Sequence, residues 1–70
     1  MYLLNQPIRA VFRDDTGRYH LDIIPAGALV HMVGASTFTG MVEVAWQGIY
    51  VHVFLTDLED RSETLLSATA

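Results

Sequence analysis

Residues 41–54 constrain the fold of this chain more than any other stretch. Valine recurs at alternate positions on both sides of its middle. A period of two is typical of a β-strand that buries one face. The middle itself is Gln47-Gly48, a pair that suits the two-residue turn of a hairpin. The stretch therefore predicts a β-hairpin in which strand 41–46 pairs with strand 49–55.

This register divides the hairpin into an apolar inward face and a mixed outward face. The outward face would pair Met41 with Phe54, Glu43 with His52, and Ala45 with Tyr50. The inward face would consist of Val42, Val44, Trp46, Ile49, Val51 and Val53.

A second hairpin is predicted between residues 8 and 24. Its loop, Asp14-Asp15-Thr16-Gly17, ends in glycine, which suits a type I turn closed by a left-handed residue. If Phe12 lies opposite Tyr19, most apolar side chains of strands 8–13 and 18–24 fall on one face of the hairpin. A slip of one residue would mix apolar and polar side chains on both faces. This register puts Arg9 opposite Asp22, an opposite-charge pair. Its apolar face would contain Ile8, Ala10, Phe12, Tyr19, Leu21 and Ile23.

The rest of the chain continues the pattern of short strands and turns. Pro25-Ala26-Gly27 predicts a turn before a strand over residues 28–33. Residues 34–40 are rich in small and hydroxyl residues and predict a loop. Thr56 and Glu59 have the spacing of a capping box, which predicts a helical turn near residues 56–60. Turn residues about every ten positions are typical of a small all-β barrel or sandwich.

The layout of residues 8–60 resembles that of a bacterial SH3-like barrel. The resemblance is carried by residues 24–30 (IPAGALV), by the hairpin 41–54 and by Thr56-Asp57-Leu58. It implies an all-β fold, which we expect to be a five-stranded, strongly bent SH3-like barrel with one short helical turn near residues 56–60. The predicted core is Ile8, Ala10, Phe12, Tyr19, Leu21, Ile23, Val30, Met32, Val42, Val44, Trp46, Ile49, Val51, Val53 and Leu58.

The small size of the chain predicts an unusually apolar single core, burial between subunits, or both. The chain has 70 residues and no cysteine, so disulfides and thiolate metal sites are excluded. A domain this short buries only about 60% of its unfolded surface and usually needs reinforcement.

We expect one domain over residues 1–60, with residues 1–7 as an N-terminal arm. Residues 61–70 form a tail that frays or becomes a short helix.

A second resemblance concerns the end of the last hairpin. Val51-His52-Val53-Phe54, followed by Leu58-Glu59-Asp60-Arg61, is similar in spacing to the pore motif of the plasmid- and cassette-borne type II dihydrofolate reductases. Those proteins are short SH3-like barrels that assemble as tetramers, so the resemblance implies an oligomeric enzyme or small-molecule binder with a site between subunits. His52 stands where that motif has Gln, Phe54 replaces Tyr, and the chain has no lysine.

Charge argues against several classes of partner. The four basic residues are all arginine, and the net charge is −4. Nucleic-acid binding depends on clustered cations, so we do not expect it. No apolar run approaches the ~18–20 residues of a membrane span, and no signal peptide is evident. We expect a cytoplasmic protein with no membrane association and no cofactor.

Few residues are candidates for chemistry. His20, His31 and His52 come from different predicted strands, so we expect no metal site. Glu43 opposite His52 is the best acid–base pair, since a carboxylate can poise an imidazole near neutrality. The alternative is an ordinary cross-strand polar pair.

An apolar surface is the strongest functional signal. Met41, Tyr50 and Phe54 are expected to face outward with His52, and Leu29 and Val33 extend this face. Such a surface exceeds what a small monomer normally exposes, unless Tyr2-Leu3-Leu4 or Leu65 and Leu66 cover it. We predict a homo-oligomer through the outer face of the last hairpin. The predicted function is a non-catalytic binding module for a protein or peptide; the alternative is the interface enzyme or small-molecule binder.

Overall fold

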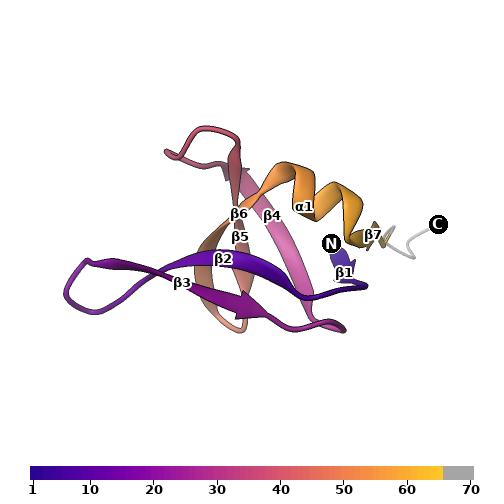
Figure 1. Cartoon of the computed structure of the whole chain (residues 1–70), viewed down its shortest axis with the longest axis horizontal. Helices are drawn as coiled ribbons and strands as arrows, with labels where there is room; N and C mark the ends of the chain where they lie inside the picture. Colours follow the sequence, from indigo (N-terminus) through magenta and orange to yellow (C-terminus); the bar gives the residue numbers. More distant parts are fainter. Residues whose placement is uncertain (66–70) are drawn as a thin grey trace.

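The computed structural model describes residues 1–65, and most of them lie in β-strands (Figure 1). The elements in chain order are β1 (Tyr2–Leu4), β2 (Ile8–Arg13), β3 (Tyr19–Ile24), β4 (Leu29–Ala35), β5 (Met41–Trp46), β6 (Ile49–Phe54), α1 (Leu55–Asp60) and β7 (Ser62–Thr64). The prediction of an all-β fold is confirmed. Within this part of the chain, no helix is long and apolar enough to cross a membrane.

The strands form a single antiparallel sheet rather than the expected barrel of five. Seven strands pair in the order β3-β2-β6-β5-β4-β1-β7, and the sheet is not closed, so β3 and β7 are its two edges. The prediction of five strands is wrong because β1 and β7 have only three residues each. Strands this short show no periodicity that a sequence could reveal.

The two short strands replace the predicted arm and tail. β1 pairs with β4 and with β7, and Tyr2 lies opposite Thr64. Leu4, at the end of β1, is buried in the core. Residues 2–4 are therefore not a free arm, and residues 62–64 are neither frayed nor helical. The remainder of the predicted tail, residues 66–70, lies outside the described residues.

The β5–β6 hairpin forms in the predicted register. The observed pairs are Met41–Phe54, Val42–Val53, Glu43–His52, Val44–Val51, Ala45–Tyr50 and Trp46–Ile49. Gln47 and Gly48 both have positive φ, 50° and 80°. Two such residues in succession are typical of a type I′ turn, whose twist matches that of the flanking strands.

The β2–β3 hairpin forms one residue out of the predicted register. Phe12 lies opposite His20, and Asp22 lies opposite Ala10 rather than Arg9. The cause is the loop, because Asp14 N donates to Arg18 O and the loop spans residues 14–18. The Asp14 carboxylate also accepts hydrogen bonds from Thr16 N, Thr16 Oγ1 and Arg18 N.

The shifted register turns all three predicted core residues of β3 outward. Tyr19, Leu21 and Ile23 are 50%, 67% and 51% exposed, so their assignment to the core is wrong. Ile24 is buried in their place.

The core lies between the inner faces of the sheet and α1. Its members are Leu4, Ile8, Ala10, Ile24, Val30, Val42, Val44, Val51, Val53 and Leu58. Phe12 and Trp46 are half-buried and pack against it. Met32 and Ile49, predicted as core, are exposed. Met32 adjoins an irregularity in the β4–β5 pairing, between Met32 and Gly34.

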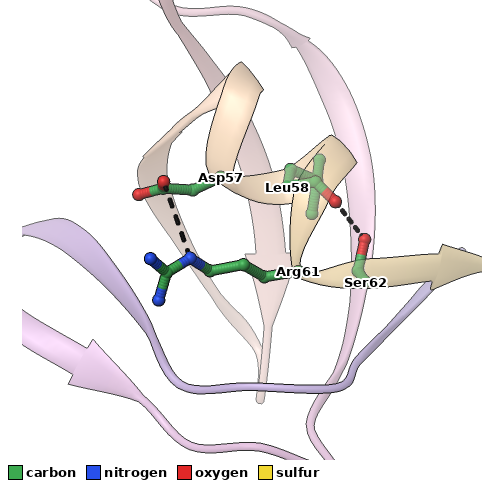
Figure 2. Close-up of polar contacts among 4 residues, drawn as sticks. All are labelled: Asp57, Leu58, Arg61 and Ser62. Atoms are coloured by element: carbon green, nitrogen blue, oxygen red, sulfur yellow. Dashed lines mark hydrogen bonds and ion pairs between the residues drawn. The ribbon is translucent and has the colours of Figure 1, made fainter.

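The predicted helical turn near residues 56–60 is confirmed as α1, but its capping differs. Phe54 is the N-cap residue and no side chain caps the helix, so the predicted capping box does not form. Leu58 is completely buried. Two contacts lie where the helix joins β7 (Figure 2). Arg61 Nε lies 4.0 Å from Asp57 Oδ1, and Ser62 Oγ donates a hydrogen bond to the Leu58 carbonyl.

Candidate functional site

Three aromatic rings from distant parts of the chain meet on the outer face of the sheet. They are Tyr19 of β3, Phe38 of the β4–β5 loop and His52 of β6, and we call them the aromatic cluster. The ring centroids lie 5.2 Å apart for Tyr19–Phe38, 5.0 Å for Phe38–His52 and 6.1 Å for Tyr19–His52. Each pair meets edge to face, an arrangement that aromatic rings prefer. The cluster is therefore a set of mutually supporting contacts.

Ser36 holds two members of the cluster in place. Its Oγ lies 2.7 Å from Nδ1 of His52, within hydrogen-bond distance. The same Oγ accepts a hydrogen bond from the backbone N–H of Phe38, at 3.0 Å. One hydroxyl thus ties the loop that carries Phe38 to the strand that carries His52, and both hydrogen bonds are partly buried.

The cluster borders a hollow of about 470 Å³. Its residues come from β2, β3, β5, β6 and the β4–β5 loop, so the sheet forms its floor and loops form part of its wall. They are Arg13, Tyr19, Thr37, Glu43, Ile49, Tyr50 and His52. Tyr50 is 64% exposed. The lining combines aromatic surface with one cation and one carboxylate, which suits a ligand that is largely apolar and carries little net charge.

The predicted acid–base pair has its predicted position but a different hydrogen-bond partner. Glu43 and His52 lie opposite each other across β5 and β6, and both are half-buried. The hydrogen bond found for the His52 ring goes to Ser36. A catalytic role for the pair stays a prediction.

The residues predicted to form one apolar surface do not gather at one site. Tyr50, Phe54, Leu29 and Val33 are exposed as expected. Met41 is only 8% exposed, so the prediction that it belongs to an exposed apolar surface is wrong, although it lies opposite Phe54 as predicted. Met41 N donates to Phe38 O and Leu55 N donates to Gly40 O, which brings the β4–β5 loop and the start of α1 beside this position.

Phe54 and Leu29 belong to two other depressions. Phe54 lines a groove of about 460 Å³ with Pro7, Ile8, Arg9, Ile23, Thr56, Asp57 and Arg61. Leu29 lines a hollow of about 430 Å³ with Pro25, Ala26, Gly27, Ala28, Trp46 and Gln47. In the first groove the Asp57 carboxylate lies beside Arg61, which reduces the positive charge that a ligand would meet (Figure 2).

The three histidines take separate positions. His20 stacks on Phe12 with ring centroids 5.9 Å apart and ring planes 7° apart. His31 lies on β4, and His52 belongs to the aromatic cluster. Among residues 1–65, no three His, Asp or Glu side chains form a group that could hold a metal ion.

Sequence reasoning misses two of the three rings of the aromatic cluster, and it also misses Ser36, which holds the cluster in place. Ser36 and Phe38 lie in a loop that has no periodicity, and the predicted register wrongly places Tyr19 in the core. The signal that could have found Phe38 is a bulky aromatic residue within a run of small and hydroxyl residues.

Comparison of the chain with protein-family models, with curated proteins and with solved structures finds no match. The function is therefore inferred from the geometry of residues 1–65 alone.

Proposed function

We propose that this protein is a small non-catalytic binding module that takes an extended, proline-containing peptide segment across the aromatic cluster. The observation that carries the proposal is the contact of Tyr19, Phe38 and His52 beside the exposed ring of Tyr50. Aromatic-lined grooves are a recurring way to bind polyproline II segments. Such segments are already extended when free, so little conformational entropy is lost on binding.

The chemistry of the hollow supports this class of ligand. Aromatic edges and faces give flat apolar surfaces on which a proline ring can pack. The backbone of a polyproline II segment has no internal hydrogen bonds, so its carbonyls can accept from the hydroxyls of Tyr19 and Tyr50. Arg13 and Glu43 offset each other in charge, which favours a neutral segment over a strongly charged one.

The finer prediction of an SH3-like domain belongs to the same proposal. It is supported by two β-hairpins, by the irregular β4 between them, and by the helical turn α1 that follows β6. SH3-like folds serve many functions, so the binding assignment depends on the site rather than the fold.

Self-association through the outer face of the β5–β6 hairpin stays a prediction. The burial of Met41 leaves that face with less apolar surface than the sequence indicated. We assign the part of it around Tyr50 to the peptide.

The proposal is tested by calorimetric titration with decaproline, with a glycine–serine peptide of equal length as the control ligand. Phe38→Ala and Tyr50→Ala should each weaken decaproline binding by about tenfold, which is typical of removing an aromatic anchor. Leu29→Ala is the matched control, because Leu29 is 49% exposed but lines a different hollow. Equal heats from both peptides, or equal effects of all three substitutions, would contradict the proposal.

A further inference from the structure

β3 presents an unusual edge to solvent. It is the terminal strand of the sheet, and within residues 1–65 no strand pairs with its outer side. Its ladder with β2 runs over six pairs without a bulge. Natural edge strands are usually protected by lysine, proline, a bulge or short length, because a free edge invites another strand. β3 has no lysine, proline or bulge, and its one charged side chain is Asp22. Tyr19, Leu21 and Ile23 stand on it at least half exposed.

The backbone groups that face outward from this edge can be assigned. Asp14 N donates to Arg18 O, and hydrogen-bonded pairs alternate along an antiparallel ladder. Residues 20, 22 and 24 therefore bond to β2, and the N–H and C=O groups of Tyr19, Leu21 and Ile23 point away from it. In agreement, Ile23 N donates to the Asp22 carboxylate rather than to β2, at 2.8 Å.

Only a few registers allow a second copy of β3 to pair with this edge around a two-fold axis. The outward-facing residues must lie opposite each other, so His20, Leu21 or Asp22 must lie on the axis. An axis at Leu21 pairs all three outward-facing residues of β3 with those of the second copy, whereas an axis at His20 or at Asp22 pairs only two of them. An axis at Asp22 also opposes two carboxylates, which is destabilising. An axis at Leu21 puts His20 of each copy opposite Asp22 of the other copy, so two such pairs form.

We propose that this protein forms a two-fold dimer by antiparallel pairing of β3 with β3 of a second copy, with Leu21 on the axis. The overlap of all three outward-facing residues and the two opposed imidazole–carboxylate pairs select this occupant, because the strand matches itself. Tyr19 lies opposite Ile23 of the second copy, so the two strands form one continuous apolar strip on the outer face. His20 and Asp22 form non-hydrogen-bonded pairs on the other face, the kind of pair in which side chains lie closest. The Ile23 N–H exchanges its bond with Asp22 for a bond between strands, which frees that carboxylate for His20.

The position of the hairpin leaves room for the second copy. The β2–β3 hairpin projects from one end of the molecule, and β1 and β7 lie at the other end (Figure 1). The chain measures 42 × 22 × 22 Å along its principal axes, so the molecule is elongated. The dimer goes beyond the proposed peptide binding and does not depend on it. It adds Ile23 of the second copy beside Tyr19 of the aromatic cluster.

Sedimentation equilibrium on the whole chain tests the dimer. The wild type should be a dimer, and Leu21→Lys should be a monomer because it opposes two cations on the axis. His20→Asp should weaken dimerisation by at least about tenfold, because it opposes two carboxylates at two symmetric positions. The His20→Asp/Asp22→His double variant exchanges the two residues and should restore most of the affinity, since each pair again joins an imidazole to a carboxylate.

Controls make each outcome decisive. All three positions are exposed, so circular dichroism should find every variant folded. Tyr50→Asp changes the outer face of the β5–β6 hairpin and should leave the dimer intact. A monomeric wild type, a dimer that survives Leu21→Lys, or a double variant as weak as His20→Asp would overturn the proposal. Decaproline binding is measured separately on dilute monomer, so the failure of one proposal does not imply the failure of the other.

Discussion

Replacing Ser36 with alanine should loosen the aromatic cluster without touching any of its rings. The substitution removes the oxygen that accepts from Phe38 N and that lies 2.7 Å from His52 Nδ1. A neutral hydrogen bond contributes about 0.5–1.5 kcal/mol net. Since two partly buried bonds are lost, the free energy of unfolding should fall by about 1–3 kcal/mol.

The expected loss is large enough to measure in a chain of this size. A domain of 60–100 residues loses roughly 4–8 °C in Tm for each kcal/mol, so Tm should fall by at least about 4 °C. Urea unfolding followed by circular dichroism gives the free energy directly, and the slope should not change. Decaproline should also bind more weakly, because Phe38 and His52 are no longer held in the bound geometry.

Thr39→Ala is the matched control, because Thr39 is an exposed hydroxyl residue of the same loop that does not line the hollow. A surface substitution of this kind changes stability by less than about 0.5 kcal/mol. If Ser36→Ala behaves like Thr39→Ala in both stability and peptide binding, then the hydroxyl does not organise the cluster and the reasoning is wrong.

Three further predictions concern the fold. Leu58→Ala should destabilise the protein by about 2–5 kcal/mol in urea unfolding, because Leu58 is completely buried and its loss leaves a cavity under α1. Gly48→Ala should lower Tm and Gln47→Asn should raise it slightly, since both positions have positive φ, which glycine and asparagine tolerate best. Hydrogen bonds from Thr16 and Arg18 lower the pKa of Asp14 in the folded protein, so the unfolded state binds the proton more readily. The stability that this carboxylate contributes is therefore present above its ordinary pKa of 3.8 and is lost as the pH falls through the lower pKa of the folded state. Asp14→Asn should remove this part of the acid sensitivity, which urea unfolding at a series of pH values measures.

The two hairpins explain what a sequence can and cannot fix about this fold. In the β5–β6 hairpin, valine alternates around a turn of two residues, and a slip would expose every buried valine. Only one register satisfies that pattern. In the β2–β3 hairpin, the observed register puts Val11, Leu21 and Ile23 on one face and Ile8, Phe12 and Ile24 on the other, so both faces carry apolar residues and the pattern favours the wrong register. The Asp14 side chain decides by holding a loop over residues 14–18.

The site is harder to predict than the sheet because its parts come from different levels of structure. His52 and Tyr50 lie on a periodic strand, and their positions follow from the sequence. Phe38 reaches the cluster through a loop ordered by hydrogen bonds of Ser36, which no periodicity encodes. Tyr19 reaches it only because the hairpin register is shifted by one residue.

Mapping amide chemical shifts during titration with decaproline tests the central claim most directly. The amides of Tyr19, Phe38, Tyr50 and His52 should shift together with one affinity, because these residues surround the proposed peptide site. Shifts confined to the groove that Phe54 lines or to the hollow that Leu29 lines would contradict the assignment of this protein as a peptide-binding module. The absence of any shift would contradict it as well.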